Sequence, residues 1–290
     1  MKKTLALSFL CLNLCVSILP TACTKVKKEK THPVPPSFSL LGSDTFGEDF
    51  DFAPLPPTRN ASNEFWDVST IDVSKIDKNK KLIAFTFDDA PASTLENILA
   101  VFANYNENNP DCEASATLFC NGNLFNENTY ATLSAAVTLG WELGNHTYSH
   151  ADITTLSENE LQSELSRTET LLSKIDNKPA HLFRAPYGRI NPEIKKAVNV
   201  PIIDWTIDTL DWTGTSADDI YNTVFSQKFS GAIVLMHDGY INTVTALKRL
   251  LPDLKEAGYQ VTSVSKMAKA HHCALKNGGT YIRARKQGNG

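Results

Sequence analysis

The segment LIAFTFDD, residues 82–89, passes from an apolar run straight into two carboxylates. Its first six residues are apolar or β-branched, which predicts a short strand at residues 82–87. Asp88 and Asp89 follow where that strand would end. Parallel α/β folds gather their chemistry at the carboxyl ends of their strands, so this junction predicts both a fold class and the place of a functional site.

Strand-like and helix-like segments alternate along the chain after this run. Further strands are expected at residues 116–120, 181–184, 202–206, 232–236 and 259–264. Helical spacing of apolar residues fills the intervals, and a capping box at Ser157 and Glu160 opens a long helix that extends to residue 175. Such alternation implies right-handed βαβ units around a parallel sheet.

Six or seven of these units within residues 78–269 predict one catalytic domain. We expect a distorted or incomplete TIM-like (β/α) barrel of about seven strands. An open doubly wound sheet is the competing α/β architecture. The Gly-rich turn typical of its dinucleotide-binding members is absent from the sequence, which favours the barrel.

Residues 1–22 have the composition of a signal peptide. Lys2 and Lys3 precede an apolar stretch at residues 5–19, which is short for a membrane-spanning helix. Ala22 directly precedes Cys23, and this junction resembles a bacterial lipoprotein signal. We therefore expect an exported protein anchored in the cell envelope by a lipid on Cys23, with no other contact with a membrane. Cleavage after Ala22 without lipid, giving a secreted protein, is the alternative.

The remaining flanks are a tether and a tail. Residues 23–77 are rich in lysine and proline, which predicts an extended tether. Residues 270–290 form a basic tail that we expect to be mobile. The net charge of −4 over 290 residues offers no basic surface for nucleic acid.

The cysteines leave one question open. Cys112 and Cys120 are close enough in sequence to form a disulfide. The alternative is that Cys120 is a small buried residue of a strand.

Polar side chains end or follow five separate segments of the chain. They are Asp88 and Asp89, His146 and His150 after residues 142–145, Arg184, Asp208 and Asp211, and His237 with Asp238. The carboxyl ends of barrel strands meet at one face, so these groups are expected to converge there.

His146 and His150 are candidate metal ligands. Their spacing of four residues is one helical turn, which would let both rings face one point. Two histidines and one carboxylate form a facial triad that leaves coordination positions open, as a catalytic metal requires. A His-x-x-x-His pair alone is a weak signal, because most such pairs are surface or hydrogen-bonded residues.

Five ordered motifs resemble those of the polysaccharide deacetylases, carbohydrate esterase family 4, whose shared unit is the NodB homology domain. The motifs are residues 86–91 (TFDDAP), 146–150 (HTYSH), 184–188 (RAPYG), 208–212 (DTLDW) and 235–238 (LMHD). The similarity covers roughly residues 80–268. One departure is Ala90, where the family usually has glycine; it changes no ligand.

The resemblance implies a metal centre and a base. Asp89, His146 and His150 would bind a divalent metal, usually zinc, with cobalt and nickel as alternatives. Asp88 would be the general base that takes a proton from the attacking water. Arg184 would orient Asp88 and keep it ionised.

The resemblance also implies an acid and a binding surface. His237 would be the general acid that protonates the leaving group. Asp211, with Asp208 as the less favoured alternative, would hold its imidazole in the productive tautomer. The backbone N–H of Tyr187 would stabilise the oxyanion. Trp212 and Leu235 would form an apolar wall for the acetyl methyl group, although core packing explains an aromatic and a leucine at strand ends equally well.

The implied activity is removal of N-acetyl groups from N-acetylglucosamine residues of a polysaccharide, peptidoglycan or chitin-like, with release of acetate. Residues 203–212 look more like the peptidoglycan and chitin deacetylases than like the acetylxylan esterases, whose O-deacetylation is the alternative reaction. A catalytically silent envelope glycan-binding protein is a further alternative. The presence of both Asp88 and His237 argues against it.

Overall fold

The computed structural model describes residues 64–285. The predicted signal peptide, Cys23 and the tether up to residue 63 therefore lie outside the described residues. Within residues 64–285, no helix combines the length and apolar character needed to cross a membrane.

The first strand, β1 (Lys81–Ala90), is the centre of the sheet. It pairs in parallel with β2 (Thr117–Cys120) on one side and β7 (Ile233–His237) on the other. Its first residues also pair in parallel with β8 (Tyr259–Thr262). The strand is longer than the predicted residues 82–87 because it continues through both carboxylates.

The other strands extend the sheet on either side of β1. They are β3 (Glu142–Asn145), β4 (Leu182–Phe183), β5 (Ile202–Ile203), β6 (Ile207–Asp208) and β9 (Thr280–Tyr281). The order is β6-β7-β1-β2-β3-β4-β5-β9, and every neighbouring pair is parallel. The sheet curls without pairing between β6 and β9, its two ends. The prediction of an incomplete (β/α) barrel is confirmed, with nine strands among the described residues rather than about seven.

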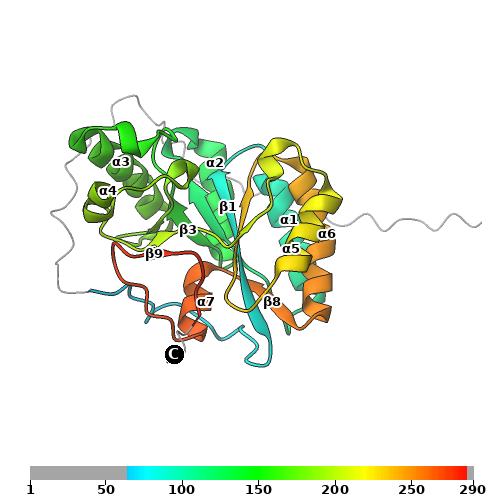
Figure 1. Cartoon of the computed structure of the whole chain (residues 1–290). Coiled ribbons are helices and arrows are strands. Elements are labelled where there is room, and N and C mark those ends of the chain that lie inside the picture. The colour runs from blue at the N-terminus through cyan, green and yellow to red at the C-terminus, as the bar shows by residue number, and fades with distance from the viewer. Residues whose placement is uncertain (1–63, 286–290) are drawn as a thin grey trace, which may run out of the picture. The chain divides into compact units, whose positions relative to one another are not determined.

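Seven helices of the described chain surround the sheet. They are α1 (Leu95–Asn108), α2 (Glu127–Thr138), α3 (Glu158–Asp176), α4 (Pro192–Ala197), α5 (Ala217–Gln227), α6 (Ile241–Glu256) and α7 (Val264–Ala270). Figure 1 shows α1, α5 and α6 together on one side of β1, with α3 and α4 on the other. The predicted capping box opens α3, since Ser157 and Glu160 exchange hydrogen bonds.

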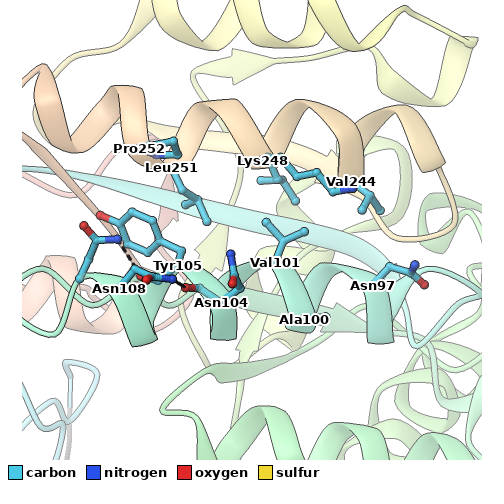
Figure 2. Close-up of a pocket in the computed structure, with 12 residues that line it drawn as sticks. Asn97, Ala100, Val101, Asn104, Tyr105, Asn108, Val244, Lys248, Leu251 and Pro252 are labelled. Atoms are coloured by element: carbon cyan, nitrogen blue, oxygen red, sulfur yellow. Dashed lines mark hydrogen bonds between the residues drawn. The ribbon is translucent and has the colours of Figure 1, made fainter. Parts of the chain in front are cut away.

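A surface groove of about 560 Å³ is lined by residues of α1 and α6. Val101 projects into it from α1, and Leu251 projects into it from α6 (Figure 2). None of the residues that line this groove belongs to the strand-end motifs. The groove is therefore a separate feature from the predicted site.

An aromatic cluster fixes β1 against α1. The Phe102 and Trp141 rings meet edge to face with centroids 4.6 Å apart, and Phe87 stacks on Trp141 at 6.0 Å. All three side chains are buried. Aromatic pairs of this geometry add to the free energy gained by burying their area, so the cluster holds the strand that carries Asp88 and Asp89.

The prediction of a mobile C-terminal tail is wrong for residues 271–285. Leu275 and Ala284 are buried, and β9 adds a strand beside β5. The N-terminal segment also packs on the fold from its first described residues, because the Trp66 backbone N–H donates to the Leu275 carbonyl. The folded unit is therefore longer at both ends than residues 78–269.

Cys112 and Cys120 are both unbridged and fully buried. Cys120 lies in β2, so the alternative of a small core residue in a strand is the one that the structure shows. Burial raises the pKa of the Cys120 thiol well above its usual value.

Candidate active site

The strand ends bring the predicted polar residues to one face. Asp88 lies opposite His237 in the β1–β7 ladder, and Asn145, directly before His146, lies opposite Cys120 in the β2–β3 ladder. Parallel strands in register end at the same edge, which is why these side chains meet.

Asp89, His146 and His150 form a cluster suited to a metal ion. Each offers one ligand atom, and these atoms all lie within 4.8 Å of one another. The Asp89 Oδ1 atom is 3.4 Å from His150 Nε2 and 3.9 Å from His146 Nε2. Asp89 reaches this position with a left-handed backbone, φ 61°. Two imidazoles and a carboxylate around one point match a three-ligand catalytic metal centre with open positions.

The segment from His146 to His150 is a loop, and the expectation of a helical turn is wrong. Thr147 and His150 have left-handed φ values of 69° and 58°, which turn the chain so that the two rings lie 5.0 Å apart. Glu164 on α3 holds the loop, because its carboxylate accepts hydrogen bonds from the backbone N–H and the hydroxyl of Ser149. The convergence therefore comes from the loop and its anchor.

His146 is held in the form that a metal needs. Its Nδ1 lies 2.8 Å from the Arg184 carbonyl, which assigns the proton to Nδ1 and leaves Nε2 facing Asp89. Burial lowers the pKa of His146, and this outweighs the opposite effect of Asp88 and Asp89. The imidazole is therefore neutral, as a ligand must be.

Asp88 is a buried carboxylate paired with a buried guanidinium. Its Oδ1 accepts a hydrogen bond from Arg184 Nη1 at 2.7 Å, and its Oδ2 lies 3.6 Å from His146 Nε2. Burial acts to raise the pKa of Asp88, but the charges of Arg184 and His237 and the hydrogen bond from Arg184 outweigh it, and the pKa is lowered. Asp88 is thus kept ionised in a nearly dry position.

Arg184 is fully buried, and all of its nitrogens are used. Its Nη1 also donates to Thr86 Oγ1, its Nε to the Ile203 carbonyl and its Nη2 to the Asp204 carbonyl. Its guanidinium carbon lies 4.2 Å from the centre of the Phe119 ring. Thr86 was not predicted as a site residue, although a strand places residues i and i+2 on one face and Thr86 precedes Asp88 by two.

His237 is paired with Asp211 on the opposite side of the site. Its Nδ1 lies 2.7 Å from Asp211 Oδ1, and Thr243 donates to Asp211 Oδ2 at 2.6 Å. Burial acts to lower the pKa of His237, but Asp211 and the other nearby carboxylates raise it. Asp208 is not part of this pair, because its Oδ1 accepts from the Leu210 backbone N–H.

Asp238 connects the ends of β1 and β7, the two strands that carry Asp88 and His237. It is 2% exposed, and its carboxylate accepts hydrogen bonds from the backbone of Ala92, Thr94 and Gly239 and from the Thr94 hydroxyl. The loop after β1 is thereby fixed to the loop after β7. The sequence motif contains Asp238 but indicates no role for it, since a buried carboxylate and a solvent-facing one look alike in sequence.

Of the three predicted binding residues, Tyr187 and Trp212 are exposed and Leu235 is buried. Tyr187 is 61% exposed, has φ 60° and places its ring edge-on to His150 at 4.7 Å. Trp212 is 53% exposed, which excludes core packing as the reason for its position. Leu235 is buried and lies opposite Thr86 in the ladder, so it packs in the floor of the site.

The chain is similar to several known proteins. The family model "Polysaccharide deacetylase" matches residues 75–200. A peptidoglycan-N-acetylglucosamine deacetylase of Bacillus cereus is 32% identical over 207 residues, which cover 68% of this chain and 93% of that protein. A bifunctional xylanase/deacetylase of Pseudobutyrivibrio xylanivorans is 33% identical over 193 residues, 66% of this chain.

One solved structure has a similar fold. It is the Xyl-CE4 domain of a multidomain xylanase from the hindgut metagenome of Trinervitermes trinervoides, with a TM-score of 0.66 and 29% identity, and the match covers 72% of this chain and 100% of that domain. The chain spans only 31% of the length of the Pseudobutyrivibrio protein. With most of the Bacillus cereus protein matched at 32% identity, the chain belongs to the polysaccharide deacetylase family.

Proposed function

We propose that this chain is a metal-dependent hydrolase that removes N-acetyl groups from N-acetylglucosamine residues of a polysaccharide, peptidoglycan or chitin-like, and releases acetate. One observation carries the proposal. An ionised Asp88 and a His237 whose pKa is raised lie opposite each other in register, beside a cluster of three metal-ligand atoms. Hydrolysis of an amide needs such a base and such an acid around one carbonyl.

The metal centre would be Asp89, His146 and His150, with zinc favoured and cobalt and nickel as alternatives. A divalent ion held there supplies Lewis-acid polarisation of the acetyl carbonyl and a lowered pKa for a coordinated water. The neutral His146 and the open side of the three-ligand cluster fit that use.

Asp88 is the proposed base. Its Oδ1 is occupied by Arg184, which leaves Oδ2 to accept the proton of the attacking water. Arg184 fixes the carboxylate in position and holds it ionised. Because Arg184 is locked by four acceptors, Asp88 needs no rearrangement before it acts.

His237 is the proposed acid. With Nδ1 bound to Asp211, its Nε2 is the atom that donates a proton to the leaving amine. Asp211 stabilises the charged ring before that transfer and fixes its tautomer. Tyr187 would offer its backbone N–H to the oxyanion, and Trp212 with Leu235 would contact the acetyl methyl group.

The substrate class is the more specific part of the proposal. It is supported by the names of the relatives and by residues 203–212. The Bacillus cereus relative is named for N-acetylglucosamine of peptidoglycan. The Pseudobutyrivibrio relative is named as a xylanase/deacetylase, which makes acetylated xylan the second candidate substrate. The same base and acid serve both reactions.

The test is acetate release from peptidoglycan, chitin oligomers and acetylated xylan, measured side by side with chelated and then metal-loaded protein. We expect metal-dependent release, faster from the N-acetylated polymers than from xylan. Asp88→Asn should lose activity and keep the metal, whereas Asp208→Asn, a strand-end carboxylate outside the site, should match the wild type. The deacetylase proposal fails if the metal-loaded wild type releases no acetate from any of the three.

The proposed location is the cell envelope, through export and a lipid on Cys23. The support is the leader at residues 1–22 and the peptidoglycan named for the Bacillus cereus relative. Fractionation of cells that express the full chain or Cys23→Ala tests the anchor. The wild type should sediment with membranes and the variant should not; equal sedimentation would refute the lipid at Cys23.

A further inference from the structure

The C-terminal segment 279–284 runs alongside β5. The Ile202 backbone N–H donates to the Gly279 carbonyl at 2.8 Å, and the Asp204 backbone N–H donates to the Tyr281 carbonyl at 2.8 Å. Figure 1 shows β9 within the last described part of the chain, which returns to the sheet. This segment lies far beyond residues 75–200, the part matched by the family model.

The same segment then reaches the start of β7 across the open side of the barrel. The Ala284 backbone N–H donates to the Gly231 carbonyl at 3.0 Å, and Arg283 forms an antiparallel bridge with Ala232. Ala284 is fully buried, and its carbonyl lies 2.8 Å from His271 Nδ1. Residues 279–284 are therefore anchored to both sides of the gap between β5 and β7.

The strand β5 depends on this neighbour. It has two residues, and its ladder with β4 contains one register pair, Phe183 with Ile202. The two hydrogen bonds that Ile202 and Asp204 donate to the Gly279 and Tyr281 carbonyls therefore add to this single register pair in fixing the β5 backbone. A strand this short has little regular structure of its own to resist a shift.

The backbone of β5 in turn holds the guanidinium of Arg184. Two of its donors end on main-chain carbonyls, Nε on Ile203 at 2.8 Å and Nη2 on Asp204 at 3.2 Å. Nη1, on the same rigid plane, donates to Asp88 Oδ1. A displacement of residues 203–204 would therefore rotate or shift the group that orients the base.

We propose that residues 279–284, with Tyr281 at their centre, are a positioning element for Asp88. They hold the Ile203 and Asp204 carbonyls, which orient Arg184, which orients the base. The proposal rests on the proposed function, since Asp88 is the base only if the chain is a deacetylase. Residues 279–284 position the base and are not catalytic themselves, because none of them reaches the reacting atoms.

The perturbing variant is Tyr281→Pro, which removes a backbone N–H and restricts φ at the last residue of β9. Gly279→Ala is a milder second variant, because a Cβ there would lie 3.0 Å from the Lys276 carbonyl and from the Tyr281 ring. Leu254→Ala is the control. Truncation of the buried Leu254 side chain leaves a cavity beneath α6 and lowers stability. Leu254 makes none of the contacts that link residues 279–284 to Asp88.

Two measurements on the metal-loaded protein test the proposal. For acetate release, we expect Tyr281→Pro to lower kcat about tenfold or more with little change in KM, since small misplacements of a catalytic group are costly. By NMR, the Arg184 Nε–H should exchange with solvent about tenfold faster or more in Tyr281→Pro, and to a lesser degree in Gly279→Ala. Leu254→Ala should change neither.

The NMR measurement separates the two proposals. If the wild type releases no acetate, the deacetylase proposal fails while Arg184 exchange still reports on the contacts. If the folded variants keep wild-type exchange and kcat, or respond only as Leu254→Ala does, residues 279–284 are merely structural and the inference is wrong. Should Tyr281→Pro not fold, Gly279→Ala provides the same test of kcat and of Arg184 exchange.

Discussion

We expect His181 to make the folded protein lose stability as the pH becomes alkaline. The ring is 2% exposed; its Nδ1 lies 2.9 Å from Glu169 Oε1 and its Nε2 lies 3.0 Å from Asp176 Oδ1. Burial acts to lower the pKa of His181, but the hydrogen bonds and charges of the two carboxylates outweigh it and raise the pKa to about 9. Neither carboxylate lies beside His181 in the chain, so this cluster has no local sequence signal.

The magnitude follows from the difference between folded and unfolded states. In the unfolded chain the pKa is the ordinary 6.5. At about 1.4 kcal/mol per pH unit, a rise to about 9 corresponds to about 3 kcal/mol of stability. Because the folded pKa is the higher one, this stability is fully present below about pH 6.5 and is lost as the pH rises through 9. The lowered pKa of Asp176, about 2, describes the same ion pair and adds nothing further.

The assay is urea unfolding of the chelated protein at several pH values between 6 and 10, with His181→Gln beside the wild type. Chelation removes the pH dependence of metal binding. The difference in free energy of unfolding between the two proteins should shrink by about 3 kcal/mol from pH 6 to pH 10. A difference that stays constant over this range would refute the assignment of a buried, charged His181.

Three other predictions concern the site and its support. Asp211→Asn should lower the pKa of His237 and move the basic limb of the pH profile of kcat/KM to lower pH, with kcat reduced on the order of 10³ to 10⁴ fold; an unmoved limb would contradict the pairing. Arg184→Met should cost about 3–5 kcal/mol in urea unfolding, because it leaves Asp88 buried without its partner. Adding Asp88→Asn should restore part of that loss, and strictly additive effects would count against the pair. The Cys120 thiol should resist a disulfide reagent until the protein is unfolded, since burial raises its pKa; fast labelling of the native protein would show otherwise.

The fold class could be predicted because β1 and the long helices have strong local patterns. Six consecutive apolar or β-branched residues and a complete capping box identify their elements without any distant contact. The strands β4, β5, β6 and β9 have two residues each, too few for a period. The strand β9 was missed altogether, because its partner β5 lies far away in the sequence and a basic, polar segment gives no local sign of pairing.

The site residues fall into the same two groups, those that the sequence predicts and those that it does not. Acidic and imidazole side chains at strand ends, such as Asp88 and His237, could be predicted from their residue type and from the order of the motifs along the chain. Thr86 could have been found only from its spacing of two from Asp88 on one face of the strand. Glu164 could not be found, since its role comes from the loop that packs beside it. The loop from His146 to His150 was expected to be helical because a spacing of four fits one turn, and nothing in the residue type of Thr147 indicates its left-handed backbone.

The left-handed backbone at Asp89, Thr147, His150 and Tyr187 has a consequence for engineering. Each such residue without glycine's freedom costs on the order of 1–3 kcal/mol, and here the cost falls on two of the proposed metal ligands and on their neighbours. Glycine at Asp89 or His150 would relieve strain while deleting a proposed ligand, and glycine at Tyr187 would remove the ring that lies against His150. Glycine at Thr147 would free the loop that joins the two histidines. Selection of variants for heat resistance alone would therefore enrich for inactive proteins, and thermostabilisation of this chain should leave these four codons unchanged.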